Sequence, residues 1–288
     1  MRIAVCGGPY ANPYALAAFI TDAWARGCER LFCLGDLGGL GAEMDSLWPL
    51  LLDGQIECIA GNYDVALARG DADCGCGYRD RRDNEFAQLI YDHTRAHTSP
   101  EFTAWMGTLP TERRVRIEGC ELHLVHGSTL ALNDFWWESL PDEEHQARAA
   151  LSGADVILCT HSGLPWQRRI GDTLAVNVGV LGKPANDGTR NVWYAVLDIE
   201  DGNARAELVA LDYDWQAQAA SMTAAGLPQP LSRRSRAAGG PPAWRSCRRA
   251  SARGGATTST AARCPTDSPR PTTGGVPLRR ARRTASCR

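Results

Sequence analysis

The first 60 residues alternate short apolar runs with segments of helical periodicity. The runs cover residues 2–6, 31–34 and 56–60, and each is followed directly by glycine. Such runs are typical of strands that are buried on both faces of a sheet. Between the first two runs, Asn12 and Pro13 form a helix-start signal, and apolar residues then recur at helical spacing. The order strand, helix, strand predicts a parallel sheet with helices on its faces.

Beyond this alternation the pattern changes to a series of short strands. A glycine- and charge-rich stretch over 65–81 is predicted to be a long loop, and helical periodicity then covers 84–97 and 100–109. Six short strands follow, with one helix among them and one after them. We expect these strands over 115–117, 121–125, 156–159, 174–178, 192–197 and 206–211, and the helices over 143–151 and 212–224. Together they predict two packed sheets flanked by helices.

The last part of the chain differs from the rest in charge and composition. Residues 231–288 contain 14 Arg, no Lys and one Asp, whereas the remainder carries 17 Lys plus Arg against 32 Asp plus Glu. This stretch has too few aliphatic residues to offset its ordering entropy. We therefore predict one folded domain over 1–222 and a disordered Arg/Ala/Gly/Pro-rich basic tail over 223–288. A basic tail can bind nucleic acid, but an out-of-frame reading of a GC-rich gene gives the same composition, so we assign it no function.

Cysteine usage and hydropathy indicate a compartment. Eight of the 11 Cys precede residue 160, and most of them stand in apolar runs. This is typical of small buried thiols in a reducing environment. No apolar stretch approaches the ~18 residues of a membrane span, and the first apolar run is too short for a secretory signal. We expect a cytoplasmic protein without a membrane partner, and its acidic folded part is not expected to bind nucleic acid.

Four polar side chains follow the ends of predicted strands. They are Asp36, Asn62, His126 and His161, and each stands beside glycine or a small residue. In parallel α/β sheets, ligands bind beyond the carboxyl ends of the strands. A carboxylate, an amide oxygen and two imidazoles form a ligand set that suits Mn, Fe or Zn. Each residue alone has another interpretation, as a turn residue or a local hydrogen-bonding group.

The order of these residues resembles that of the calcineurin-like metallophosphoesterases, in particular the small bacterial phosphodiesterase-type members. The resemblance runs from Arg2 to about Leu211 and rests on motifs that keep the family's order. They read RIAVCGGPYAN, LGDLGG, GNYD, VHGS, THSGLP and NVGV. The resemblance implies an α/β (α+β) fold, a four-layer αββα sandwich of two mixed β-sheets flanked by helices. It also implies that Asp36 bridges two metals and that Asn62 binds the second metal and reaches the phosphate. His126 and His161 would complete the second metal site.

Four positions depart from the family's pattern. Gly8, Tyr10 and Gly163 stand where the family has an Asp and two His that hold the first metal. Tyr63 stands where the family has a His that resembles a general acid for the leaving group. Every loss falls on one side, so the resemblance implies a retained second-metal site beside a degenerate first-metal site.

Three functional hypotheses follow. The first is a metal-dependent phosphoesterase that hydrolyses a phosphomonoester or phosphodiester, with Asp36 and Asn62 as catalytic residues. It would use Mn, Fe or Zn, one or two ions per chain. The alternative is a non-catalytic regulatory protein that binds a metal or a phosphate ligand, and the third is a structural subunit that pairs with an active homologue. The substrate is expected to be a small phosphorylated molecule. Small family members often form dimers, which leaves a homodimer open.

Other side chains can replace the lost ligands or line the site. Tyr10 and Tyr63 can offer phenolates to a metal or simply fill the emptied space. Cys74 and Cys76 lie in a glycine-rich loop that can fold back over Asn62, where two thiolates would favour zinc or iron; an ordinary turn is the other interpretation. We expect seven further polar residues to belong to turns or the surface, and the aromatic run 135–137 to form a lid or a dimer surface. The seven are Arg81, Asp83, Asn84, Asn133, Lys183, Asn186 and Asp187.

Overall fold

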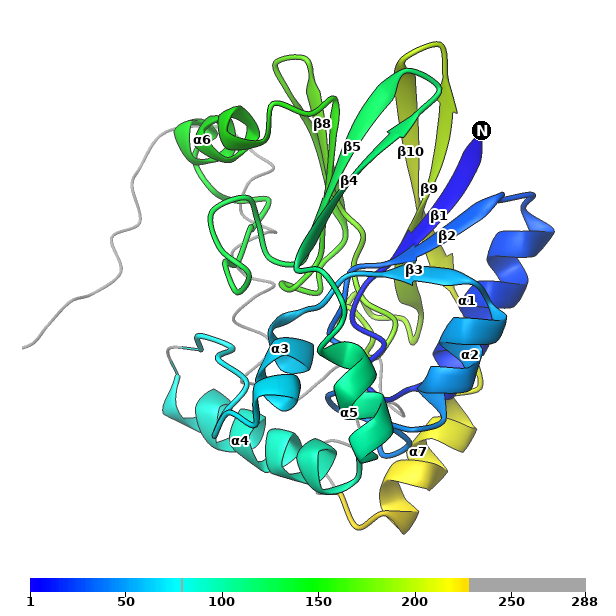
Figure 1. Ribbon diagram of the computed structural model, residues 1–288, viewed down its shortest axis with the longest axis vertical. Coiled ribbons are helices and arrows are strands. Elements are labelled where there is room, and N and C mark those ends of the chain that lie inside the picture. The colour runs from blue at the N-terminus through cyan, green and yellow to red at the C-terminus, as the bar shows by residue number, and fades with distance from the viewer. Residues whose placement is uncertain (79, 228–288) are drawn as a thin grey trace, which may run out of the picture. The chain divides into compact units, whose positions relative to one another are not determined.

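The computed structural model describes residues 1–78 and 80–227, which contain two five-stranded β-sheets (Figure 1). The first sheet has the order β10-β9-β1-β2-β3. Its strands are β1 (Arg2–Cys6), β2 (Arg30–Cys33), β3 (Ile56–Cys58), β9 (Val192–Glu200) and β10 (Asn203–Leu211). β1, β2 and β3 are parallel, as predicted, and β9 pairs with β1 antiparallel. The first sheet is therefore mixed.

The second sheet has the order β4-β5-β6-β8-β7 and is also mixed. Its strands are β4 (Glu112–Ile117), β5 (Cys120–Val125), β6 (Val156–Cys159), β7 (Trp166–Ile170) and β8 (Thr173–Asn177). β5, β6 and β8 run parallel, while β4 and β7 form antiparallel edges. The parallel strands of both sheets therefore offer several carboxyl ends from which loops can build a site.

Helices cover the outer faces of the two sheets. They are α1 (Pro13–Ala25), α2 (Leu47–Asp53), α3 (Asn62–Arg69), α4 (Arg81–Ala96), α5 (Pro100–Met106), α6 (Asp142–Ser152) and α7 (Trp215–Ala224). Figure 1 shows α1, α2 and α7 on the side of the first sheet and α6 beside the second. Asn12 caps α1 by accepting a hydrogen bond from the Ala15 amide at 3.1 Å, so the predicted start of this helix is confirmed.

Side-chain alternation along the strands separates three cores. In β1, Ile3 and Val5 pack between the two sheets, whereas Ala4 and Cys6 pack against the helices. β6 alternates in the same way. Val156 and Leu158 pack between the sheets, and Ile157 and Cys159 pack toward the α6 side. A strand with both faces buried reads as a continuous apolar run. The arrangement is the predicted four-layer αββα sandwich.

Two local predictions were wrong. The loop predicted over 65–81 begins with a helix, because α3 covers Asn62–Arg69 and buries only Ala66 and Leu67 as aliphatic residues. Such a small apolar face leaves little periodicity to detect. The edge strand β7 was missed because Arg168 and Arg169 interrupt its apolar pattern. Edge strands commonly carry charged residues.

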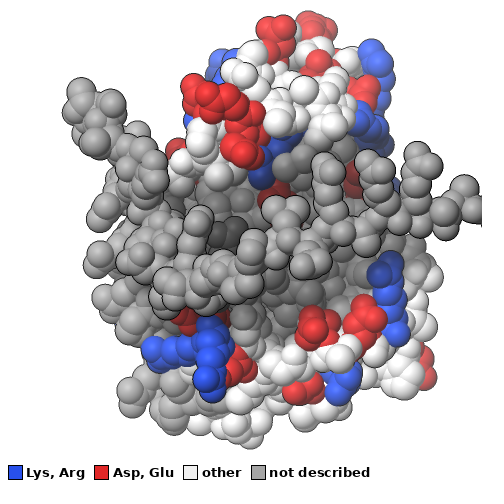
Figure 2. Space-filling view, turned by 90° about the vertical axis from the view of Figure 1, so that its left-hand side faces the viewer, with Lys and Arg blue, Asp and Glu red and all other residues white. Residues whose placement is uncertain are grey.

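α7 is the last helix of the described residues. α7 ends at Ala224, two residues beyond the predicted domain boundary, and the predicted tail lies outside the described residues from 228 onward. Within the described residues, we find no helix that is both long enough and apolar enough to span a membrane. Figure 2 shows acidic and basic side chains interspersed on the face of the described part that it presents.

The loops that follow the parallel strands are tied to one another by backbone hydrogen bonds. The loop after β8 pairs with the loop after β1, where Leu181 N–H donates to Gly7 O at 2.9 Å and Gly182 N–H donates to Gly8 O at 2.8 Å. Thr160 N–H donates to His126 O at 2.9 Å and so joins the loops after β5 and β6. Residues far apart in the sequence are thereby brought to one edge of the sandwich.

Candidate metal centre

Three of the four predicted ligands converge. His126 Nε2 lies 3.2 Å from Asp36 Oδ2 and 3.1 Å from His161 Nδ1. One donor atom from each of the three residues falls within 4.8 Å of the others, and all three residues are buried. Two donor atoms that share one transition-metal ion at about 2.1 Å are separated by roughly 3 Å. The three side chains therefore have the spacing of ligands to a common cation.

The orientation of His126 is fixed from the opposite side of its ring. His126 Nδ1 lies 2.7 Å from the carbonyl oxygen of Leu34, so Nδ1 carries the proton and donates it. In the neutral ring, the lone pair of Nε2 then faces the Asp36 carboxylate and the nitrogen of His161. Lone pairs that face one another in a buried site require a proton or a cation between them.

The pKa values reflect this crowding. Burial lowers the pKa of His126, but the Asp36 carboxylate more than offsets it, so the pKa lies above its usual range. Burial would raise the pKa of Asp36, yet the positive charge of His126 holds it below its ordinary value. Burial and the charge of His126 together lower the pKa of His161 to about 3. His161 is therefore a neutral imidazole, the form that binds metals.

Asn62 is the fourth predicted ligand. It is the first residue of α3, and its Nδ2 donates to the carbonyl oxygen of Cys74 at 2.8 Å. Its Oδ1 is buried and has no hydrogen-bond partner among the described residues, and the same is true of His161 Nε2. A buried polar atom without a partner is costly unless a ligand completes it. The carboxylate, the two imidazoles and the amide oxygen fit a divalent transition metal such as Mn, Fe or Zn.

The loop of residues 73–77 does fold back over Asn62, but as a disulfide. Cys74 and Cys76 are bonded to each other, and Asn62 Nδ2 also lies 3.4 Å from Cys76 Sγ. In this disulfide form the two cysteines offer no thiolate to a metal. The pair lines the site and holds the Asn62 amide. Six other Cys in the described residues are free and buried, as expected: Cys6, Cys28, Cys33, Cys58, Cys120 and Cys159.

The backbone at two of the ligands is strained. Asp36 has φ +57° and His161 has φ +51°, in the left-handed region that residues with a side chain seldom adopt. Such conformations persist where the surroundings impose them, and they cluster at functional sites. Asn177 supplies part of this restraint, since its Nδ2 donates to Thr160 O at 2.8 Å and to Ser162 Oγ at 3.0 Å on either side of His161.

Asp64 was missed by the sequence analysis as a site residue. It is fully buried, and its carboxylate accepts hydrogen bonds from the backbone amides of Asp36, Leu37 and Gly61 at 2.8–2.9 Å. It therefore ties the loop that carries Asp36 to the start of α3. Burial and the charge of Asp36 raise its pKa to about 7, against the effect of the amide donors. Its place three residues after Gly61, as in a helix-capping pattern, was the signal that could have found it.

Tyr10 fills the side of the site where the sequence departs from the family's pattern. Its ring packs on Gly8, and a Cβ atom at Gly8 would come within 2.7 Å of the Tyr10 ring carbon Cζ. Gly8 also has φ +43°, a conformation that disfavours any side chain. A carboxylate at position 8 and the Tyr10 ring thus exclude one another. In this arrangement Tyr10 fills space that the ligand would need.

Tyr63 lies in the same hollow as Tyr10, Asp36 and His161. Its ring packs edge-on against Tyr91, with 5.6 Å between the ring centroids. Burial raises the pKa of Tyr63 well above its usual range, so without a bound cation its hydroxyl keeps its proton and can donate a hydrogen bond.

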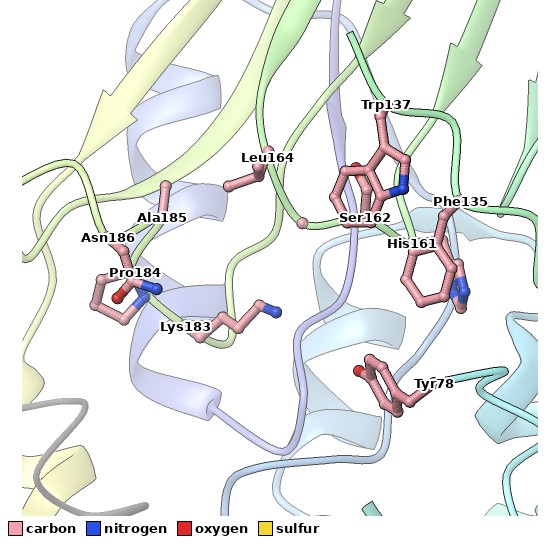
Figure 3. A pocket seen from close by; sticks show the side chains of 11 residues that line it. Tyr78, Phe135, Trp137, His161, Ser162, Leu164, Lys183, Pro184, Ala185 and Asn186 are labelled. Carbon is pink, nitrogen blue, oxygen red and sulfur yellow. The ribbon is translucent and has the colours of Figure 1, made fainter. Parts of the chain in front are cut away.

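An aromatic hollow adjoins the ligands. Phe135 stacks on Trp137 with centroids 5.1 Å apart and lies 4.3 Å from the His161 ring centroid. Figure 3 shows these side chains and Tyr78 on one side of the hollow and Lys183 and Asn186 on the other. The prediction that residues 135–137 form a single surface is corrected in part. Trp136 is fully buried, because it packs edge-on against Trp166 in the core.

The other polar candidates have structural roles or lie at the surface. Arg81 pairs with Glu85 at 2.8 Å on α4, and its side chain is 92% exposed. Asn84 and Asn133 hold loop carbonyls, donating to Tyr78 O at 3.0 Å and to Gly75 O at 2.7 Å. Asp83 is buried on α4, and Asp187 caps a turn through Thr189 N–H at 2.8 Å. Lys183 and Asn186 differ from them because they line the hollow beside His161.

Comparisons with known proteins identify a matching family and similar folds. A family model, the calcineurin-like phosphoesterase superfamily domain, matches residues 1–202. The protein MJ0912 of Methanocaldococcus jannaschii is 24% identical over 227 residues, covering 74% of this chain and 88% of its own length.

Two solved structures have the same fold. A metallophosphoesterase from Sphaerobacter thermophilus is similar with a TM-score of 0.65 and 21% identity, over 83% of this chain and 99% of that chain. The hypothetical protein PH1004 from Pyrococcus horikoshii OT3 is similar with a TM-score of 0.68 and 18% identity, over the same shares. At this level of identity the likeness supports the fold alone.

Proposed function

The chain belongs to the calcineurin-like phosphoesterase superfamily, and on this premise we propose that it is a metal-dependent hydrolase of small phosphoesters. The observation that carries the proposal is the convergence of Asp36, His126 and His161 donor atoms within 4.8 Å in a buried site. The Asn62 amide oxygen, which has no partner among the described residues, supports it further.

We propose that Asp36, Asn62, His126 and His161 hold the metal. A divalent ion bound there would act as a Lewis acid on a phosphoryl oxygen and lower the pKa of a water molecule. The chain contributes orientation, because the Leu34 carbonyl fixes the His126 tautomer at 2.7 Å and Asp64 fixes the loop of Asp36. Burial of the three donor residues excludes bulk water and strengthens each electrostatic contact.

Tyr63 is proposed to donate a hydrogen bond to the substrate. It lines the hollow together with Asp36, and its raised pKa keeps the hydroxyl protonated. It stands at the position where the resemblance places a histidine that serves the leaving group. A phenol of raised pKa is a weaker acid than an imidazolium, so substrates with good leaving groups should be favoured.

The ester group of the substrate is proposed to lie against Phe135 and Trp137. Their stacked rings form one wall of the hollow that begins at His161. Aromatic rings bind flat apolar groups by stacking and by excluding water. A phosphomonoester or phosphodiester of an aromatic alcohol fits this wall better than a short alkyl ester.

A non-catalytic phosphate-binding protein is the second candidate. The specific observation in its favour is the Tyr10 ring, which packs on Gly8 and fills the space beside the ligands. A superfamily member with one metal would lack the second cation that helps to clamp a phosphoryl group in two-metal sites. Turnover separates the two candidates, since both bind metal and phosphate.

Turnover is best measured on the full chain after chelator treatment and reloading with Mn, Zn or Fe. The substrates are 4-nitrophenyl phosphate and bis(4-nitrophenyl) phosphate, and the variant is His126→Gln. Turnover that requires metal and disappears in the variant supports the hydrolase. Stoichiometric metal binding without turnover on either ester would move the function to the binding protein.

A further inference from the structure

Lys183 is the only lysine in the 288 residues, in a chain that otherwise uses Arg for its positive side chains. It follows Gly182, whose amide donates to Gly8 O at 2.8 Å. This hydrogen bond fixes the loop after β8 against the loop after β1. The start of the Lys183 side chain is thereby held at the edge where the ligand loops meet.

The Lys183 side chain runs across Gly163 toward the hollow. A Cβ atom at Gly163 would lie 2.9 Å from Lys183 Cε and 3.2 Å from its Nζ. Nζ also lies 5.9 Å from the centroid of the Tyr10 ring, within the range of a cation–π contact. Figure 3 shows Lys183 across the hollow from Phe135, His161 and Tyr78. Its stem thus occupies the space that a side chain at position 163 would need.

The ammonium belongs to the same hollow as the ligands. Asp36, His161, Tyr10 and Lys183 line one hollow together, and His161 and Lys183 also line the neighbouring aromatic one. Lys183 therefore places its positive charge beside the candidate ligands.

Two cations in one small hollow repel each other unless an anion lies between them. A metal ion at Asp36 and His126 and the Lys183 ammonium would form such a pair. A phosphoryl group carries several negatively charged oxygens and can contact both cations at once. Among the described residues that line this hollow, Asp36 is the acidic one.

We propose that Lys183 binds a phosphoryl oxygen of the substrate, and that it supplies the second positive charge where Gly8, Tyr10 and Gly163 exclude a second metal. This inference rests on the proposed function, since it assigns the phosphate subsite of the same centre. The site is then a pair of one metal and one ammonium. Lysine suits this task as a compact charge on a flexible stem.

The first experiment uses Lys183 as its own probe. The full-length, Mn-loaded protein is treated with the acetyl ester of N-hydroxysuccinimide, and the acetylation rate of Lys183 is followed by mass spectrometry with and without inorganic phosphate. Because Lys183 is the only lysine, the other amine that reacts readily is the N-terminus, which serves as an internal control. Phosphate should slow the acetylation of Lys183 about tenfold and leave the N-terminus unchanged.

The second experiment measures the affinity for inorganic phosphate by calorimetry. Lys183→Met should weaken phosphate binding about tenfold to a hundredfold, the effect of one hydrogen bond to a charged group. Lys183→Arg should keep part of the affinity because it keeps the charge. Arg116→Met removes an exposed cation on β4 and should change nothing. Metal content and melting temperature should be the same in all four proteins.

The outcomes separate this inference from the proposed function. Equal phosphate affinity in Lys183→Met and wild type, or no protection of Lys183, would overturn the inference even if the enzyme turns over. Lys183-dependent phosphate binding without any turnover would sustain the inference and overturn the hydrolase. A second metal ion in wild type would also overturn it, because the ammonium would then not be the second charge.

Discussion

The two sides of the site differ in what fills them. On one side, Asp36, His126 and His161 bring donor atoms within 4.8 Å of one another and Asn62 adds an oxygen without a partner among the described residues. On the other side, the Tyr10 ring packs on Gly8 and the Lys183 stem packs on Gly163. The first side has the spacing of a site for a cation from solution. The second side carries the Lys183 ammonium, and we propose that packing and this fixed charge take the place of the missing ligand set.

Removal of His126 should have the largest effect on this comparison. His126→Gln takes away the nitrogen that lies 3.1–3.2 Å from both other ligand atoms. We expect loss of bound metal and a fall in kcat/KM of roughly a thousandfold or more, since a catalytic metal contributes several kcal/mol. Elemental analysis and turnover on the same samples measure both effects.

His123→Gln is the matched control for that variant. His123 is a buried histidine within β5, the strand that His126 follows, and its partners are Ser152 Oγ at 2.9 Å and Glu112 Oε2 at 3.1 Å. It touches none of the ligands named above, so its loss should lower stability and leave the metal in place. Equal metal loss in both variants would mean that the His126 effect is one of folding.

A substitution at Asn62 tests whether its buried amide oxygen belongs to the proposed metal site. Asn62→Leu removes Oδ1 and also the donor that binds Cys74 O at 2.8 Å. We expect metal affinity to fall about tenfold to a hundredfold, as for other changes around a metal site. The double variant Cys74→Ser/Cys76→Ser, which keeps Asn62 but opens the disulfide, should fall less. A Zn²⁺ competition titration gives both affinities, and an unchanged affinity in Asn62→Leu would remove it from the ligand set.

A substitution at Gly163 tests the side of the site that the Tyr10 and Lys183 side chains fill. Gly163→Ala places a methyl group 2.9 Å from Lys183 Cε at φ +70°. The left-handed conformation alone costs about 1–2 kcal/mol, and the overlap adds to it. In a Lys183→Ala background the overlap disappears and only the backbone cost stays, so the two changes should be non-additive. Urea unfolding of the four proteins closes the cycle; strict additivity would show that Lys183 does not lie over Gly163 in solution.

The aromatic wall should have the smallest effect. Phe135→Ala removes a ring that lies 4.3 Å from His161 and stacks on Trp137. We expect the KM for bis(4-nitrophenyl) phosphate to rise several-fold, in line with the ~1 kcal/mol of an aromatic contact. The KM for a methyl ester should change little. Equal changes for both esters would place the leaving group elsewhere.

The sequence was sufficient for the ligand side because each ligand follows a strand whose apolar run is recognisable. Asp36 comes after β2, His126 after β5 and His161 after β6, so the carboxyl ends of the strands predicted their convergence. The four layers followed from the same runs. α3 escaped detection because it buries few apolar residues, and β7 because its arginines interrupt the apolar pattern.

The side of the site that Tyr10 and Lys183 fill was harder to predict, because it depends on contacts between distant segments. Lys183 looked like a turn residue, and its position over Gly163 depends on the pairing of Gly182 with Gly8. Asp64 is an acidic residue near a helix start, which by itself predicts a cap. Its bonds to the amides of Asp36 and Leu37 depend on how two strands lie side by side. The disulfide likewise depends on a loop conformation that the glycines leave open.

The most direct test of the two-sided site is the number of metal ions per chain. The full-length protein is purified without chelator, supplied with excess Mn, freed of loosely bound ions and measured by elemental analysis beside His126→Gln. We predict one ion per chain in wild type and none in the variant. Two ions per wild-type chain would contradict it, because Tyr10 and Lys183 would then leave room for the metal that they are inferred to replace.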